Sequence, residues 1–227
     1  MKRTRAGALL SAATALVVLI AGLVIGGCRR SDDQRDGAGA SADTATTATR
    51  FMDGALYGAP STRGIVIVAG DSGTAAWAPL AGELTKLGYQ VAVLPLPRSD
   101  DVTSVRAAAQ QLMANGAERV VFIGSRDGAA AALAGAAGGA AGVALLNPGE
   151  IAPEVAVPPV SFLALASLAD GESSATAQRL YRTAREPRSL ALYPAHDPAP
   201  TVLAGETGDL KNAFLDFLRA AFQPLSA

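Results

Sequence analysis

From residue 65 onward, short continuous runs of hydrophobic residues alternate with longer stretches in which apolar positions recur with helical spacing. A short run that is apolar at every position is typical of a strand buried on both faces of a sheet. The predicted strands are 65–68, 90–94, 119–123, 143–146, 160–166 and 189–193. The predicted helices are 77–87, 102–114, 128–137, 175–184 and 210–222. This alternation predicts an α/β fold whose sheet is mostly parallel and carries helices on both faces.

Glycine, proline and asparagine mark the ends of these predicted elements. Gly88 follows the first helix as a C-cap, and Asn115-Gly116 ends the second helix. Residues 51–58 (FMDGALYG) precede the first buried strand and are expected to form an antiparallel hairpin at the sheet edge. The chain has 227 residues, of which 50% are hydrophobic, so it is long enough for one domain with a substantial core. We place that single domain at residues 51–227.

The first residues have the three-part pattern of an export signal. Lys2, Arg3 and Arg5 form a positive segment, and residues 6–25 are apolar and carry no charge. Such a segment targets a protein for secretion and is left out of fold reasoning. We therefore assign residues 1–27 to a signal peptide. The apolar run also approaches the roughly 20 residues that span a bilayer, so an uncleaved membrane helix is the alternative.

The end of this segment, Ile25-Gly26-Gly27-Cys28, resembles a bacterial lipobox. That resemblance implies cleavage before Cys28, lipid on its thiol and an acyl group on its freed amine. Two or more acyl chains make a firm membrane anchor. Cys28 is the only cysteine of the chain, so no internal disulfide forms. Arg29, in place of aspartate, favours transfer to the outer membrane of a Gram-negative envelope.

Residues 28–50 connect this cysteine to the predicted domain. They contain almost no large apolar side chain, so burial cannot offset the entropy that ordering them would cost. We expect them to form a flexible tether. The formal net charge of the chain is −1, which gives no reason to expect a partner nucleic acid.

The order of motifs in the domain resembles the α/β-hydrolase family. The matching segments, in chain order, are Ala69–Gly73, Leu87–Val91 (LGYQV), Leu94–Pro97 (LPLP), Arg119–Gly124, Val157–Val160 and Tyr193–His196. The resemblance covers about residues 60 to 225 and implies the α/β-hydrolase architecture in one domain. The stretches after Pro97 and from Asn147 to Pro159 are short, so no large lid is expected.

The nucleophile elbow of that family reads G-x-S-x-G, in which small residues let a sharp strand-to-helix turn lift the serine above the sheet. Here the segment is Gly124-Ser125-Arg126-Asp127-Gly128, with arginine at the nucleophile position. A guanidinium stays protonated in proteins and has no acceptor, so Arg126 is neither nucleophile nor general base. The standard acyl-enzyme mechanism cannot use it.

Two other residues fall at catalytic positions of the family. The resemblance puts His196, the only histidine of the chain, at the position of the base and Asp170 at the position of the acid. Arg126 would then stand at the carboxyl ends of the strands, where doubly wound folds bind ligands. It either pairs with Asp170 and joins two loops, or offers its two-pronged guanidinium to a carboxylate or phosphate.

The segment Gly70-Asp71-Ser72 corresponds to the oxyanion loop of the family. Ser72 and Ser125 are the candidates for a replacement nucleophile. Ser125 is adjacent to Arg126 on a strand end, so its hydroxyl should point to the opposite side. Both serines are also common turn residues that bond to nearby backbone.

Three functions remain open from the sequence. The first is an envelope-anchored lipoprotein that is non-catalytic or catalytically diverged, a pseudoenzyme that binds an envelope protein. The second is an active esterase-type hydrolase that uses Ser125 or Ser72 with His196 and Asp170. The third is a module that binds a small anion around Arg126. No cofactor or metal is expected, because neither ligand clusters nor a glycine-rich phosphate loop occur in the sequence.

Overall fold

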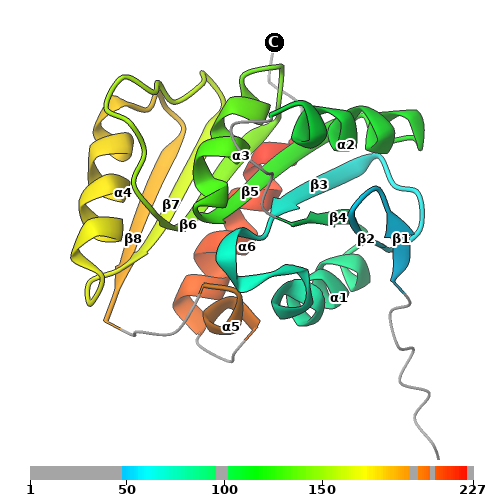
Figure 1. Ribbon diagram of the computed structural model, residues 1–227, viewed down its shortest axis with the longest axis horizontal. Coiled ribbons are helices and arrows are strands. Elements are labelled where there is room, and N and C mark those ends of the chain that lie inside the picture. The colour runs from blue at the N-terminus through cyan, green and yellow to red at the C-terminus, as the bar shows by residue number, and fades with distance from the viewer. Residues whose placement is uncertain (1–47, 96–101, 195–198, 205–207, 224–227) are drawn as a thin grey trace, which may run out of the picture. The chain divides into compact units, whose positions relative to one another are not determined.

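The computed structural model describes residues 48–95, 102–194, 199–204 and 208–223, which form an eight-stranded sheet with helices packed against it (Figure 1). The strands are β1 Thr49–Phe51, β2 Gly54–Tyr57, β3 Arg63–Val68, β4 Gln90–Leu94, β5 Arg119–Arg126, β6 Gly142–Pro148, β7 Ser161–Ser167 and β8 Arg188–Tyr193. The α-helices are α1 Ala78–Lys86, α2 Val102–Ala114, α3 Gly128–Ala136, α4 Gly171–Thr183, α5 Ala199–Ala204 and α6 Gly208–Phe222. Two short 3₁₀ helices, η1 Gly70–Ser72 and η2 Thr74–Trp77, follow β3.

The strand order of the sheet is β1-β2-β4-β3-β5-β6-β7-β8. β1, β2 and β4 pair antiparallel, and every pair from β4 to β8 is parallel. The chain passes from β3 to β4 on one side and then returns to β5 on the other side of β3. The carboxyl ends of β3 and β5 therefore flank the point where the winding direction reverses, which is the ligand-binding position of doubly wound sheets.

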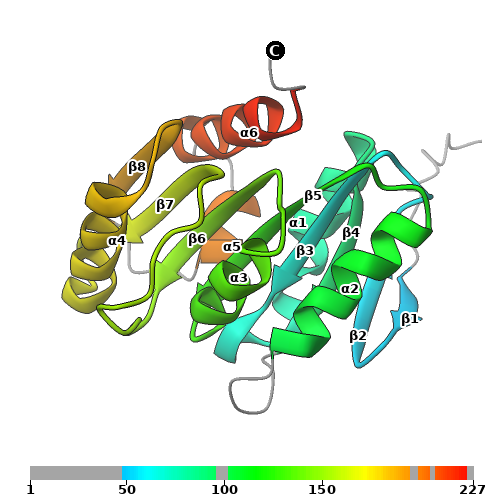
Figure 2. The ribbon, with the colours of Figure 1, turned by 90° about the horizontal axis from the view of Figure 1, so that it is seen from above.

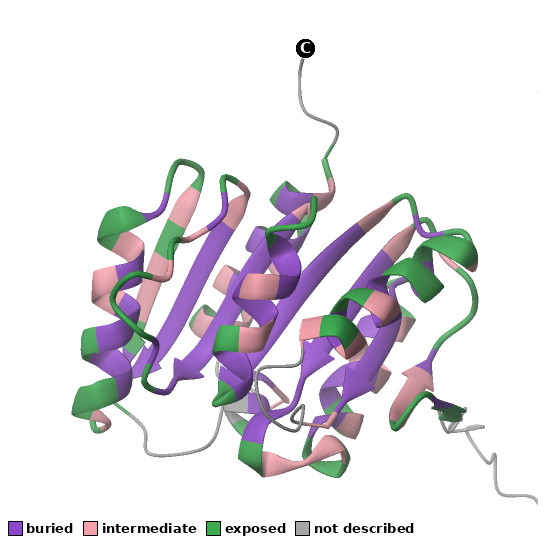
Figure 3. Ribbon diagram, turned by 45° about the horizontal axis from the view of Figure 1, so that its top comes forward, coloured by how far each residue is buried: buried purple, intermediate pink, exposed green. Residues whose placement is uncertain are grey.

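Alternate residues of each central strand contribute to two separate hydrophobic cores. In β3, Val66 and Val68 pack in the core under α2, α3 and α4, whereas Ile65 and Ile67 pack in the core under α1, α5 and α6. Figure 2 shows these two groups of helices on opposite faces of the sheet. The central strands are buried along their length (Figure 3), as a sheet covered on both faces requires.

The fold predicted from the sequence is confirmed, and the predicted strands and helices differ from the observed ones at their ends. The hairpin predicted for 51–58 is present as β1 and β2. α4 begins at Gly171, earlier than the predicted 175, because Asp170 caps its first turn. The 3₁₀ turns after β3 and the short helix α5 were not predicted. No helix among the described residues has the length and apolarity that a membrane span requires.

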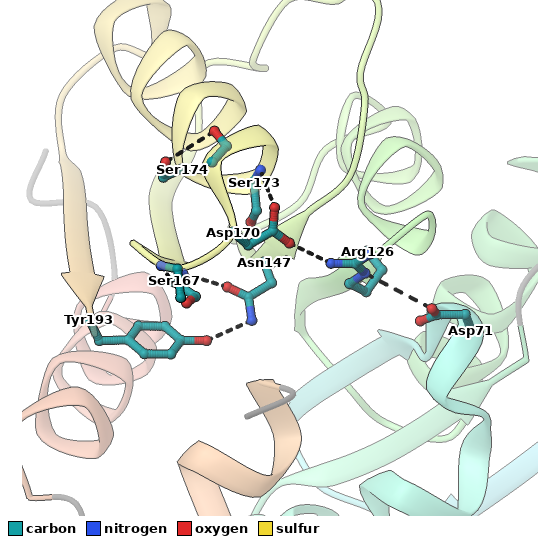
Figure 4. Close-up of polar contacts among 10 residues, drawn as sticks. Asp71, Arg126, Asn147, Ser167, Asp170, Ser173, Ser174 and Tyr193 are labelled. Atoms are coloured by element: carbon teal, nitrogen blue, oxygen red, sulfur yellow. Dashed lines mark hydrogen bonds and ion pairs between the residues drawn. The ribbon is translucent and has the colours of Figure 1, made fainter. Parts of the chain in front are cut away.

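A buried polar network joins the carboxyl ends of β6, β7 and β8. The Asn147 side chain donates from Nδ2 to the Tyr193 hydroxyl at 2.7 Å, and its Oδ1 accepts from the Ser167 backbone N–H at 2.7 Å (Figure 4). Asn147 is 5% exposed and has a left-handed backbone with φ of 45°. Asparagine tolerates this conformation better than most residues. The network holds three strand ends in register just below the loop that carries Asp170.

We predict that Asn147→Ala lowers the free energy of unfolding by about 2–4 kcal/mol, because it removes two buried hydrogen bonds and puts alanine in a left-handed conformation. Asn147→Gly is the matched control, since it removes the same bonds but accepts a positive φ, and it should be less destabilised by about 1 kcal/mol. Urea denaturation measures both. Two variants within about 0.5 kcal/mol of the parent would show that the network contributes little.

Candidate functional site

The turn from β5 to α3 has the geometry that a nucleophile elbow needs. Arg126 ends β5 with φ of 51°, and one residue, Asp127, separates it from the first residue of α3. A Cβ on Gly124 would lie 2.7 Å from both the Ala129 Cα and the Ala132 Cβ. A Cβ on Gly128 would lie 2.6 Å from the Val68 carbonyl oxygen. The two glycines therefore allow α3 to pack directly against β5 and β3.

The side chains of Ser125 and Arg126, the last two residues of β5, point in opposite directions. Ser125 is 2% exposed, whereas the Arg126 side chain is 44% exposed above the carboxyl edge of the sheet. This difference agrees with the alternation expected along a strand. Arg126 therefore stands where the fold would present a nucleophile, and Ser125 is buried beneath it.

The Arg126 guanidinium contacts carboxylates from two other loops, as Figure 4 shows. Its Nη1 lies 2.6 Å from Asp170 Oδ2, and its Nε lies 4.0 Å from Asp71 Oδ2. The ion pair with Asp170 that the sequence suggested is thus present. Asp71 follows β3 and Asp170 follows β7, so one arginine links the loops after β3, β5 and β7. All three side chains are partly exposed, so each pair contributes only about 0.2–1 kcal/mol.

Both carboxylate oxygens of Asp170 are engaged. Oδ2 accepts from Arg126, and Oδ1 accepts from the Ser173 backbone N–H at 3.1 Å, which caps the first turn of α4. The Asp170 backbone N–H donates to the Ser167 carbonyl at 3.2 Å. The Ser167 backbone N–H in turn donates to Asn147 Oδ1, so the buried strand ends fix the position of this carboxylate. In this arrangement Asp170 acts as a helix cap and as an ion-pair partner.

The segment Gly70–Ser72 forms the 3₁₀ turn η1 directly beside the elbow. Gly70 has φ of 63°, and a Cβ on it would lie 2.3 Å from the Ser125 carbonyl oxygen. The Ser72 hydroxyl donates to the Ala69 carbonyl at 2.7 Å and accepts from Trp77 Nε1 at 3.2 Å. The loop after β3 is thus packed against the elbow, and its serine holds the turn together.

The described residues bring together six of the predicted site positions: Gly70, Asp71, Ser72, Ser125, Arg126 and Asp170. His196 and Cys28 lie outside the described residues. Asn147 and Tyr193 were not predicted as site residues. The positive φ of Asn147 could not be expected from the sequence either, because the residue before a proline normally has an extended backbone. Within the described ranges, no three His, Cys, Asp or Glu side chains are grouped as a metal site would require.

The structure is similar to solved hydrolases at low sequence identity. The esterase domain of a Rhodothermus marinus protein matches with a TM-score of 0.53 and 18% identity, covering 74% of this chain and 90% of that one. A dienelactone hydrolase from Anabaena variabilis matches with a TM-score of 0.55 and 16% identity, covering 77% and 94%. The Pyrococcus furiosus esterase Pf2001 matches with a TM-score of 0.58 and 13% identity, covering 73% and 86%.

No protein-family model matches the sequence, and no curated protein matches it with significance. Identities below one fifth show a shared fold and carry no statement about activity. The strand order, the sharp turn after β5 and these structural matches agree with one another. The described part of this chain has the α/β-hydrolase fold.

Proposed function

We propose that this chain is an envelope-anchored lipoprotein whose α/β-hydrolase-fold domain binds a partner and does not turn over an ester. The observation that carries the proposal is Arg126 at the β5–α3 turn, held 2.6 Å from Asp170. A hydrolase of this fold needs a nucleophile at that turn. A guanidinium donates hydrogen bonds only, so it cannot attack a carbonyl carbon or accept a proton.

The engagement of Asp170 supports the same proposal. In a serine triad the carboxylate orients the histidine and stabilises its charged form. Here one oxygen caps α4 and the other accepts from Arg126. The carboxylate is neutralised by a cation from the end of β5, two strands away in the sheet, which removes the reason for a histidine to pair with it.

The alternative is an active esterase with a displaced serine, and the geometry does not favour it. Ser125 is 2% exposed below the sheet edge. The Ser72 hydroxyl already donates to one partner and accepts from another. A nucleophile must reach both a base and the substrate, and neither serine has this freedom in the described arrangement.

The local charge also does not favour a small-anion module around Arg126. Two carboxylates, Asp71 and Asp170, flank a single guanidinium, so the three side chains sum to one negative charge. An anion would have to displace Asp170 from a contact of 2.6 Å. A protein partner that contacts the exposed surfaces of Asp71, Arg126 and Asp170 would not have to displace Asp170 from Arg126.

Anchoring to the envelope rests on the sequence. The apolar segment that ends in Ile25-Gly26-Gly27-Cys28 is the support for lipid attachment, and the small-residue stretch to residue 50 would separate the lipid from the domain. A partner in the cell envelope follows from this location. Arg29 after the cysteine favours the outer membrane.

We predict that the full chain forms no covalent adduct with a fluorophosphonate. Only a serine activated by a base and an oxyanion site reacts, so labelling should be less than about one hundredth of that of a control serine esterase in the same tube. Intact-mass spectrometry measures the adduct. A stoichiometric adduct that is lost in Ser125→Ala or in Ser72→Ala would overturn the non-catalytic proposal and identify the nucleophile.

We predict that the chain incorporates radiolabelled palmitate when it is expressed in a bacterial host, and that Cys28→Ser abolishes the label. The sulfur of Cys28, at the lipobox position, is the atom that would receive the lipid. The matched control combines Cys28→Ser with Ser31→Cys, which keeps one thiol but moves it, and it should also lack the label. Palmitate retained in either variant would contradict lipidation at this position.

A further inference from the structure

The two edge strands of the sheet differ in their protection against pairing with a further strand. β1 has three residues and carries Arg50, whereas β8 has six residues. The stretch 189–193 of β8 (SLALY) contains neither a charge nor a proline. Short length, charge and proline are devices that keep an edge strand from pairing. Within the described residues no strand lies outside β8, so 189–193 form an edge without any of these protections (Figure 2).

The hydrogen bonds to β7 show which backbone groups of β8 point outward. The Pro187 carbonyl accepts from the Phe162 N–H at 3.0 Å. At the other end of the pair, the Tyr193 carbonyl accepts from the Leu168 N–H at 2.7 Å. In a parallel pair alternate residues of a strand bond to the same neighbour, so the odd-numbered residues from 187 to 193 face β7. The N–H and C=O groups of the even-numbered residues between them therefore point away from the sheet.

Two leucines supply these outward groups, and their side chains add an apolar surface at the edge. Leu190 and Leu192 are two positions apart, so their side chains lie on the same face of β8. Leu190 packs against the core under α2, α3 and α4, and Leu192 is 37% exposed. Leu168, directly after β7, is 56% exposed. A strand placed beside β8 would bond to the outward backbone groups and cover Leu192.

The sequence of this edge is complementary to itself. Leu190-Ala191-Leu192 reads the same in both directions. An antiparallel pair of two copies therefore allows a register in which Ala191 lies opposite Ala191. In that register each Leu190 lies opposite Leu192 of the other copy and exchanges both backbone hydrogen bonds with it. The leucine side chains then meet across the pair, on the face of the sheet that carries α4.

The residues on either side end this ladder without leaving a donor unpaired. In the same register Arg188 lies opposite Pro194 of the other copy. The Arg188 N–H already donates to Glu186 Oε2 at 3.1 Å, and Pro194 has no N–H. The outward donors of β8 that are available to a second strand are thus those of Leu190 and Leu192, and the register pairs both.

α4 adds charge complementarity to the antiparallel arrangement. Its first turn carries Glu172, whereas its last turn carries Arg182 and is followed by Arg185, and all three are exposed. α4 packs against β7 and β8 at this end of the sheet (Figure 1). A two-fold axis between two β8 strands puts both copies of α4 on the same face and runs them in opposite directions. The acidic end of each helix then lies toward the basic end of the other, and like-charged ends are kept apart.

We propose that β8 pairs with β8 of a second copy of this chain, so that one sheet continues through a two-fold dimer. The contact is the same on both copies and occupies the β8 edge of each, so the assembly closes at two chains and does not extend into a fibre. The dimer requires neither lipid on Cys28 nor the non-catalytic role proposed for the elbow.

The test is disulfide cross-linking of the full chain carrying Cys28→Ser, in which an introduced cysteine is the only thiol. In the proposed register Ala191 lies opposite its own copy in a pair without hydrogen bonds, where the Cα atoms are about 4.5 Å apart. This separation permits a disulfide. We expect Ala191→Cys in this background to form a covalent dimer under mild oxidation. Non-reducing gel electrophoresis measures the dimer, and peptide mapping identifies the disulfide.

Ser189→Cys in the same background is the matched control. Ser189 belongs to the same strand and is more exposed than Ala191. The proposed register separates its two copies by about 13 Å along the strands, which exceeds the reach of a disulfide. We expect at least about fivefold less disulfide than for Ala191→Cys. Random collision would instead favour the more exposed position.

A second change tests the edge without a cysteine. Leu192→Lys puts a charge on the exposed part of β8, which is one of the devices that prevent edge pairing. We expect sedimentation equilibrium in a mild detergent to give the mass of two chains for the parent and of one chain for Leu192→Lys. Met113→Lys is the control, because Met113 is 49% exposed on α2, and it should leave the dimer intact. Circular dichroism shows that each variant is folded.

Equal cross-linking at positions 189 and 191, or none at 191, would overturn the proposal. A dimer that persists in Leu192→Lys would also overturn it, because the contact would then lie elsewhere, for example in the apolar residues 6–25. A parent with the mass of one chain would overturn it as well and leave the β8 edge to a strand of another protein. These results are separate from fluorophosphonate and palmitate labelling, so failure here is distinguishable from failure of the proposed function.

Discussion

The backbone turn between β5 and α3 is the constraint on which the rest of the site depends. Arg126 has a left-handed φ of 51°, and the flanking Gly124 and Gly128 leave no room for a Cβ. This turn sets α3 against β3 and β5 and lifts the side chain of residue 126 over the switch point of the sheet. A serine at position 126 would be placed to act as a nucleophile. Arg126 instead places a positive charge between the loops that carry Asp71 and Asp170.

The surrounding structure stabilises that cation. Asp170 is fixed by its role as the cap of α4 and by the loop that follows β7, and the Asn147 network holds the end of β7 from below. The Arg126 guanidinium pairs with the Asp170 carboxylate, whose position is fixed by these contacts, and its Nε lies near Asp71. The result is a cross-link between the loops after three parallel strands, at the edge of the sheet where doubly wound folds bind ligands.

Much of the fold follows from local sequence, because strands buried on both faces must be apolar at every position. The Gly124–Gly128 turn was predicted from the resemblance of this segment to the G-x-S-x-G elbow. The Asn147–Tyr193 bond was not, since it joins residues 46 positions apart whose proximity depends on sheet order. His196 and Cys28 were predicted from the sequence and lie outside the described residues.

The most direct test of the account is a double-mutant cycle between Arg126 and Asp170, measured as free energies of unfolding in urea. Arg126→Ala removes the cation, and Asp170→Asn removes the charge while it keeps a good helix cap. We predict a coupling energy of about 0.3–1 kcal/mol that decreases in 1 M salt, as expected for a partly exposed ion pair. If the changes in the free energy of unfolding were strictly additive, Arg126 would not stabilise Asp170. The claim that an Arg126–Asp170 ion pair occupies the elbow would then be wrong.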